Sequence, residues 1–296
     1  MSKWIGGLAE WREGDITYLS IAFTWKLEEA YQRAIFARAQ GMRVIAGGPA
    51  LYLKTMKHRL EDVAEIGKEY PDAVIHHNPM ATIASRGCPV GCWFCIVPKM
   101  EGKEFTLLPD FPVRPILCDN NLSALPAKYQ DYIIERYNAE DVKLIDANSG
   151  FEPITFTEEV YLRWKPLIRA GGGPWRFAFD TTEEAPQVRR VMAMLKDEQP
   201  KHKRPYVLIG NEPFDACMAR IQETLDAGCE PHVQWVVKLT ALEKQPWVRY
   251  DWTARKLRDV ARWANRRSWR YTPFSGYIPN LKSPAEEYDA QQGLFV

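Results

Sequence analysis

The sequence predicts an α/β fold, with a partial (β/α)6 barrel of the TIM type preceded by a small Rossmann-like βαβ region. Apolar segments that resemble strands recur about every thirty residues from residue 80 onward, and segments with helical periodicity separate them. A shorter strand–helix–strand pattern precedes them. Regular alternation of this kind is typical of parallel sheets, which can curl into part of a barrel.

The first region spans residues 1–79. DITYLSIAF at 15–23 has the composition of a buried strand, and the LEEAYQRAIFARAQG that follows places apolar residues at helical spacing and ends in glycine. MRVIAGG at 42–48 is predicted as a second strand, and DAVIH at 72–76 as a third. A helix between two strands forms a βαβ unit, so we expect a small parallel sheet here.

The second region, residues 80–245, contains the predicted barrel. Its six strands are expected at 80–86, 115–119, 143–147, 176–180, 206–210 and 232–239. The helices between them are expected near 122–137, 157–169, 185–196 and 214–227. A further helix near 254–266 belongs to a C-terminal region, residues 246–296, which we expect to pack on the barrel. In such barrels the catalytic groups lie at the carboxyl ends of the strands.

Charge and composition exclude several classes of protein. The 296 residues carry a net charge of +1, so the chain as a whole has no electrostatic footprint for nucleic acid or an acidic membrane. No apolar run has the length of a membrane span, and the N-terminus has acidic residues and no apolar segment of the kind found in signal peptides. We therefore expect a cytoplasmic protein with no membrane partner, in which clustered cysteines are metal ligands.

Three cysteines lie close together just after the first barrel strand. SRGCPVGCWFC contains Cys88, Cys92 and Cys95, separated by three residues and then by two. Zinc could bind these thiolates with His76 or His77 as a fourth ligand. Structural zinc usually uses paired C-x2-C sequences, however, and a cluster of the ferredoxin type needs a fourth cysteine.

The remaining three cysteines, Cys118, Cys217 and Cys229, are isolated in the sequence. A third interpretation is therefore a [4Fe–4S] cluster that is held by three thiolates and keeps one iron open for another ligand.

CPVGCWFC resembles the C-x3-C-x2-C loop of radical S-adenosylmethionine (SAM) enzymes, including an aromatic residue, Phe94, before the third cysteine. The flanking RGCP and IVPKMEG are also similar, and the resemblance covers about residues 80–275. It implies a [4Fe–4S] cluster bound by the three cysteines, with SAM on the fourth iron. It also implies an electron donor such as flavodoxin or ferredoxin, and a 5′-deoxyadenosyl radical that takes hydrogen from a substrate.

The resemblance further implies SAM contacts at the next two strand ends. After the second strand, Asp119, Asn120 and Asn121 stand where the family often has a GGE-like sequence. Alternatively, the two asparagines form a turn and cap the next helix. After the third strand, DANSGFEP groups Asp146, Asn148, Ser149 and Glu152, of which Asn148 is the predicted SAM contact.

Three more SAM contacts are implied after the fourth and fifth strands. Asp180 follows the fourth strand, and we expect one of the threonines after it to cap the next helix. In VLIGNEPFD, Gly210 allows close approach of the backbone, and Asn211 is the neighbouring candidate. In the sixth strand His232 and Gln234 share a face that alternates with that of Val233 and Trp235, and one of these pairs should face the barrel interior.

Two further segments bear on ligands. The segment at 254–271 has seven basic residues and one acidic residue, which indicates either a solvated helix face or a site for a phosphate-bearing substrate or nucleic acid. The N-terminal region resembles a shortened cobalamin-binding domain, including GGPA at 47–50. It lacks the D-x-H-x-x-G sequence of many such domains, so we expect no cobalamin.

The sequence thus predicts a radical SAM enzyme whose catalytic substrate contacts are unknown. The substrate could be a nucleotide or nucleic-acid base, a peptide or a small metabolite, and the basic C-terminal segment favours the first. The alternative of a different class is a zinc-stabilised interaction module without catalysis.

Overall fold

The computed structural model describes residues 4–67, 72–148 and 150–279 of the chain. The predicted contribution of Ser149 lies outside these residues. The fold is mixed α/β and divides into two compact units. The first unit combines residues up to 176 with 237–245, and the second combines 177–236 with the residues from 246 onward. The domain boundaries expected at 79/80 and 245/246 remain predictions.

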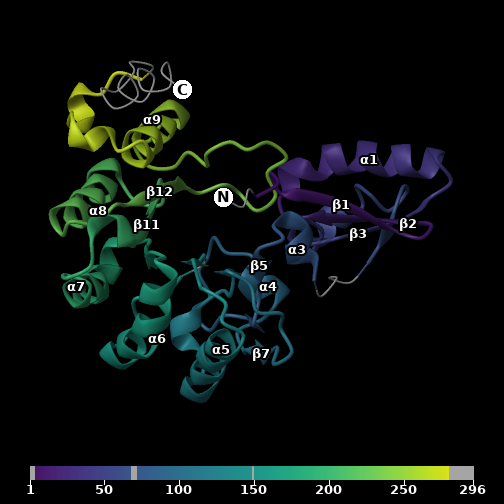
Figure 1. Ribbon diagram of the computed structural model, residues 1–296. Helices are drawn as coiled ribbons and strands as arrows, with labels where there is room; N and C mark the ends of the chain where they lie inside the picture. The colour runs from purple at the N-terminus through teal and green to yellow at the C-terminus, as the bar shows by residue number, and fades with distance from the viewer. Residues whose placement is uncertain (1–3, 68–71, 149, 280–296) are drawn as a thin grey trace, which may run out of the picture. The chain divides into compact units, whose positions relative to one another are not determined.

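The first unit begins with a four-stranded sheet in the order β1-β2-β3-β4. These strands are β1 (Leu8–Glu13), β2 (Ile16–Ile21), β3 (Arg43–Gly47) and β4 (Glu65–Ile66). β2, β3 and β4 pair in parallel, and helix α1 (Leu27–Ala39) connects β2 to β3 and lies along the sheet (Figure 1). The buried residues of α1 recur at helical spacing, namely Leu27, Ala30, Ala34 and Ala37. The predicted βαβ unit is therefore confirmed.

Two details of this region differ from the prediction. DAVIH is not a strand: it forms helix α3 (Ala73–His77), which packs against β1, and the strand beside β3 is β4. A run of three apolar residues fits either structure, and here the packing against β1 decides. The antiparallel strand β1 was not predicted. Its residues 10–13 are mostly exposed and polar, so the sequence lacks the apolar run that indicates a buried strand.

The rest of the first unit contains a parallel sheet in the order β5-β8-β9. Its strands are β5 (Ala81–Thr82), β8 (Ile116–Leu117) and β9 (Asp146–Ala147), with helices α5 (Ala127–Ala139) and α6 (Glu158–Gly171) after the second and third. A separate hairpin of β6 (Ser85–Arg86) and β7 (Thr106–Leu107) encloses the short helix α4 (Val97–Met100). The cysteine sequence lies inside this hairpin.

A third sheet has the order β10-β11-β12. Its strands are β10 (Trp175–Phe179), β11 (Lys203–Ile209) and β12 (His232–Trp235), and the helices of this part are α7 (Ala185–Met194), α8 (Phe214–Asp226) and α9 (Ala254–Asn265). β11 and β12 are parallel, α8 contacts β11, and α9 contacts β12 (Figure 1). Side chains alternate along β10: Trp175, Phe177 and Phe179 are buried, whereas Arg176 and Ala178 are half-buried.

The short helical segments complete the secondary structure. They are η1 (Thr24–Lys26), η2 (Pro49–Leu51), α2 (Lys54–Lys57), η3 (Leu122–Ala124), η4 (Thr182–Glu184), η5 (Pro200–His202), η6 (Ser268–Arg270) and η7 (Phe274–Gly276). Across the described ranges, no helix is long and apolar enough to cross a membrane.

The α/β class is confirmed, and each of the six strands predicted from residue 80 onward overlaps a strand of the structure. In the described part of the chain these strands form separate three-stranded sheets and no closed barrel. The partial barrel therefore stays a prediction.

Candidate functional site

The cysteine loop begins at the carboxyl side of β5 and is closed at its base by the β6–β7 hairpin. Ser85 pairs with Leu107 and Arg86 with Thr106. The next residue, Gly87, has φ +91°, and a Cβ atom there would lie 2.1 Å from the carbonyl oxygen of Glu104. Only glycine fits such a close approach of two backbones at a positive φ. The chain therefore turns into the loop at a position defined by backbone geometry.

Glu101 holds the base of this loop together. Its carboxylate accepts hydrogen bonds from the backbone N–H of Gly87 at 2.7 Å, from Asn120 Nδ2 at 2.6 Å and from Arg86 Nη1 at 3.1 Å. The Glu101 side chain is only 6% exposed. Charge-assisted hydrogen bonds in such surroundings are stronger than neutral ones. This role of Glu101 was not predicted, although its place as the acidic residue of the IVPKMEG segment was a usable signal.

Hydrogen-bond donors point at the sulfurs of Cys88 and Cys95. Cys88, Cys92 and Cys95 are half-buried thiols. Asn121 Nδ2 donates to Cys88 Sγ at 3.9 Å, and the backbone N–H of Val97 donates to Cys95 Sγ at 3.4 Å. Hydrogen bonds of this kind are also made to the sulfurs of metal-bound cysteines. The donor set of the loop therefore suits a thiolate-ligated cluster.

Within the ranges that the structure describes, no three or more His, Cys, Asp or Glu side chains are grouped so that they could hold a metal ion. Ordering of ligands and binding of the metal are coupled in many such loops.

Phe94, the aromatic residue of the loop, is half-buried and packs edge-to-face with Trp93, with ring centroids 5.5 Å apart.

Asp119 is fully buried and joins the ends of two strands. Its Oδ2 accepts from the Ala84 backbone N–H at 2.9 Å, and its Oδ1 accepts from Ser85 Oγ at 2.5 Å. Burial raises the pKa of Asp119 to about 6 despite these donors. Its side-chain oxygens are thus used within the protein, so a SAM contact at this position would fall to the backbone.

The raised pKa of Asp119 predicts a pH-dependent stability. The folded protein binds a proton at the Asp119 carboxylate more tightly than the unfolded chain does, so protonation of Asp119 stabilises the fold. This stabilisation is complete below the ordinary pKa of 3.8 and is lost as the pH rises through about 6. The free-energy difference is roughly 3 kcal/mol. We expect the difference in the free energy of unfolding between the wild type and Asp119→Asn to decrease by this amount as the pH rises from 3.8 to about 6. Urea denaturation at several pH values measures it, and parallel curves for the two proteins would contradict the prediction.

The two asparagines after Asp119 have different roles. Asn120 contacts the cysteine loop through Glu101 and through the Gly87 carbonyl oxygen, to which its Nδ2 lies at 3.3 Å. Asn121 is the N-cap of η3: its Oδ1 accepts from the Ala124 backbone N–H at 3.2 Å. The capping alternative is therefore confirmed for Asn121. Its Nδ2 remains directed at Cys88, so one side chain serves both as a cap and as a contact to the loop.

The third strand end contributes an ion pair that was not predicted. Asp146 receives two hydrogen bonds from Arg176, both at 2.6 Å, and both side chains are largely buried. Asn148 donates its backbone N–H to the Leu117 carbonyl, and its side chain hydrogen-bonds to Cys118. Burial raises the pKa of Cys118 to about 12, so this thiol is protonated at neutral pH.

In the second unit, the predicted residues Asp180, Gly210 and Asn211 contact other parts of the same unit. Thr181 caps η4 in a capping box with Glu184, which confirms the expected threonine cap. Asn211 Nδ2 donates to the Asp180 carbonyl oxygen at 2.5 Å. Gly210 has φ +85°, and a Cβ there would lie 2.9 Å from Leu257 Cδ2. The close approach that Gly210 allows is thus to a side chain of α9.

Arg220 connects these strand ends and was missed. It is 2% exposed, and it donates to the carbonyl oxygens of Phe179 at 2.6 Å and Leu208 at 2.8 Å. It also lies 3.0 Å from Glu212 and 3.3 Å from Asn211 Oδ1. An arginine on the apolar face of a predicted amphipathic helix was the available signal.

The histidines do not favour the zinc alternative. His76 stacks on Trp11 with ring centroids 3.9 Å apart, and His77 Nε2 lies 3.0 Å from Ser20 Oγ. Both rings are therefore engaged with the N-terminal sheet. In β12, His232 and Gln234 are exposed, whereas Val233 is buried.

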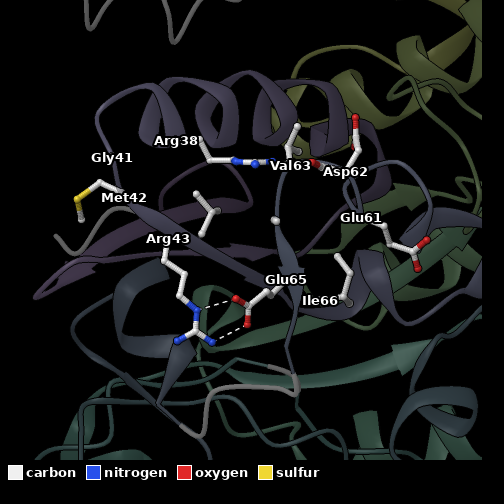
Figure 2. A pocket seen from close by; sticks show the side chains of 11 residues that line it. Arg38, Gly41, Met42, Arg43, Glu61, Asp62, Val63, Glu65 and Ile66 are labelled. Carbon is white, nitrogen blue, oxygen red and sulfur yellow. Dashed lines mark hydrogen bonds and ion pairs between the residues drawn. The ribbon is translucent and has the colours of Figure 1, made fainter.

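Described residues of the first unit line at least two hollows. Figure 2 shows one of about 810 Å³, where Arg43 and Glu65 form a bidentate ion pair on neighbouring strands. This pair is exposed and its charges balance, so it offers no surplus charge to a ligand. The second, of about 380 Å³, is at the carboxyl ends of β3 and β4, between Gly47, Gly67 and Met100 of α4.

Comparison with models of known protein families finds no match, and neither does comparison with curated proteins. The function is therefore argued from the chemistry of the site alone.

Proposed function

We propose that the chain is a radical SAM enzyme, in which Cys88, Cys92 and Cys95 bind three irons of a [4Fe–4S] cluster and SAM binds the fourth. The observation that carries the proposal is the C-x3-C-x2-C loop at the carboxyl side of β5, with N–H donors directed at Cys88 and Cys95. A cluster held there would supply one electron to SAM, whose sulfur–C5′ bond breaks to give methionine and a 5′-deoxyadenosyl radical.

The chain's own residues have supporting roles in this proposal. Glu101 holds the base of the loop through Gly87 and Asn120, so the loop is attached to the end of the second strand. Asn121 donates to Cys88 Sγ, and hydrogen bonds to cluster sulfurs raise the reduction potential. We further propose that the strands from β5 to β12 form a partial barrel, in which Asn148, Asp180, Gly210 and Asn211 lie near SAM.

The radical would take a hydrogen atom from a substrate. Three substrate classes are compatible with the sequence: a nucleotide or nucleic-acid base, a peptide, or a small metabolite. An external one-electron donor such as flavodoxin or ferredoxin is required. The second candidate, a zinc-stabilised module, rests on the same three thiols, but His76 and His77 are engaged elsewhere in the unit.

The test is anaerobic reconstitution with iron and sulfide, followed by SAM and dithionite. We expect about four irons per chain, an electron paramagnetic resonance signal after reduction, and 5′-deoxyadenosine as product. A colourless protein with about one zinc per chain and no 5′-deoxyadenosine would support the zinc module and overturn the proposal.

A further inference from the structure

Three arginines of the second unit surround one buried carboxylate. Glu230 lies two residues before β12, and its side chain is 6% exposed. Arg267 Nη2 donates to Glu230 Oε2 at 2.6 Å, and Arg270 Nη2 donates to Glu230 Oε1 at 2.7 Å. Arg204 Nη2 lies 3.8 Å from the same Oε2. These four residues are called the Glu230 cluster below.

The Glu230 cluster carries more positive than negative charge. Its three guanidinium groups face one carboxylate, which leaves two positive charges in surplus. Guanidinium groups gathered around one carboxylate repel one another, and a second anion beside them reduces this repulsion. A guanidinium group has five N–H donors, and Arg267 and Arg270 each use one of theirs for Glu230. The side chains of Arg204, Arg267 and Arg270 are 36%, 41% and 43% exposed, so a ligand can reach them.

The protein holds these arginines in place before a ligand binds. Asn265, the last residue of α9, both donates to and accepts from the backbone of Val233 at 2.8 Å, which fixes the end of α9 to β12. Arg267 has φ +57°, a left-handed conformation that concentrates at functional sites in residues other than glycine. The Arg270 guanidinium lies over the Trp269 ring, 5.2 Å from its centroid. Side chains ordered in this way lose little entropy when they bind an anion.

Charge and shape favour a phosphate monoester as the ligand. Guanidinium groups bind phosphate oxygens in bidentate geometry. A phosphate monoester carries a charge of about −1.5 to −2 at pH 7, which matches the surplus of the cluster. A phosphodiester of a nucleic-acid backbone carries a single negative charge and matches it less well.

The Glu230 cluster lies at the opposite edge of the sheet from the predicted SAM contacts. Arg204 is near the start of β11, whereas Gly210 and Asn211 follow its end. The step from Arg204 to Gly210 spans about 20 Å of extended chain. Glu230 likewise precedes β12, which is parallel to β11. A phosphate bound here is therefore far from the strand ends at which the proposed function places SAM.

We propose that the Glu230 cluster binds the phosphate group of a phosphate monoester. As a binding site it does not rest on the proposed function. The phosphate belongs either to a small phosphorylated molecule or to the 5′ end of a nucleic acid, because both sources offer the chemistry that the cluster recognises.

The test is isothermal titration calorimetry of the full chain in a phosphate-free buffer of low salt. Ribose 5-phosphate is the monoester probe, dimethyl phosphate is the diester, and ribose is the uncharged control. We expect one ribose 5-phosphate per chain with a Kd of about 1 mM or tighter, and no binding of ribose. Dimethyl phosphate should bind about tenfold more weakly, because it has less charge and fewer free oxygens.

Two variants locate the site. Arg204→Gln removes the arginine that is farthest from Glu230 and leaves both short hydrogen bonds of Glu230 intact. The Kd for ribose 5-phosphate should rise about tenfold, the effect of one charge-assisted hydrogen bond. Arg204→Gln, Arg270→Gln leaves Arg267 and Glu230 with balanced charges, and the Kd should rise about 100-fold. Urea denaturation checks that the variants fold, and the single variant decides if the double variant does not.

Arg12→Gln, Arg59→Gln is the matched control, since it removes two positive charges from exposed positions of the first unit. This variant should bind ribose 5-phosphate like the wild type. An equal loss of binding in the control, or an unchanged Kd in Arg204→Gln, overturns the proposal. So does a wild type that binds no ribose 5-phosphate up to about 10 mM, or that binds dimethyl phosphate equally well.

A labelled single strand of about 10 nucleotides, with and without a 5′-phosphate, distinguishes the two sources of the monoester. Binding of the 5′-phosphorylated strand that is tighter than that of ribose 5-phosphate supports a nucleic-acid end as the ligand. Weaker or equal binding supports a small phosphorylated molecule. Binding that is the same with and without the 5′-phosphate, and is lost in Arg204→Gln, Arg270→Gln, overturns the assignment to a monoester.

The two proposals fail in different ways. Binding of ribose 5-phosphate does not need SAM or a reduced cluster, and SAM cleavage without substrate does not need Arg204 or Arg270. The double variant should therefore still form 5′-deoxyadenosine after reduction. A wild type that cleaves SAM but binds no ribose 5-phosphate overturns the phosphate-site proposal alone.

Discussion

Replacement of Cys88, Cys92 or Cys95 by alanine, one at a time, is expected to abolish the formation of 5′-deoxyadenosine. Three thiolates bind three of the four irons and leave one open, so loss of one cysteine removes a ligand, and the loop contains no further cysteine to replace it. Bound iron should fall well below about four per chain. Iron and sulfide analysis, absorption spectra and chromatographic detection of 5′-deoxyadenosine check the result.

Cys229→Ala is the matched control for these variants. Cys229 is buried and lies outside the cysteine loop, and burial raises the pKa of its thiol to about 11. This variant should keep the iron content and the product of the wild type. The proposed role of the loop is contradicted if a loop variant keeps both the full iron content and the full yield of 5′-deoxyadenosine.

Gly87→Ala is expected to disrupt the base of the loop. A Cβ atom would lie 2.1 Å from the Glu104 carbonyl oxygen, which belongs to the backbone and has no rotamer to change, and φ is +91°. The hairpin must open to admit it, at a cost of about 4 kcal/mol in the free energy of unfolding. The hydrogen bond from the Gly87 N–H to Glu101 would be weakened at the same time.

Gly102→Ala provides the comparison within the same loop. Gly102 also has a positive φ, of +84°, but a Cβ there meets nothing within 4 Å. Its cost is the backbone strain alone, about 1 kcal/mol. Urea denaturation of the two variants measures the difference, which we expect to be about 3 kcal/mol. Equal destabilisation would show that φ, and not the contact with Glu104, determines the effect.

Local sequence patterns predicted most of the regular structure. Apolar runs that recur about every thirty residues identified the six strands after residue 80, and helices with a clear buried face follow several of these strands. The prediction was wrong at DAVIH, where three apolar residues between an aspartate and a histidine carry no distinguishing period and the contact with β1 selects a helix. β1 itself was missed, since strands with exposed polar residues resemble loops in sequence.

The site residues were predicted less evenly. The positions of the candidate residues near strand ends followed from the strand pattern, but the direction of each side chain did not. Asp119 was a candidate ligand contact, yet its carboxylate is bound to Ala84 and Ser85, 35 and 34 residues earlier in the chain. Asn211 and Arg220 also depend on residues distant in sequence. They donate hydrogen bonds to the carbonyl oxygens of Asp180 and Phe179, which lie 31 and 41 residues earlier in the chain.

By itself, the sequence determined the cysteine spacing on which the proposed chemistry rests and the order of most strands and helices. Cysteine spacing and apolar periodicity are local properties, and they persist whatever the rest of the chain does. Only the tertiary structure decided which polar side chains hydrogen-bond between strand ends and which hydrogen-bond to the cysteine loop. It directs Glu101 and Asn121 to the cysteine loop and encloses Asp119, since burial and hydrogen-bond partners are set by residues distant in sequence.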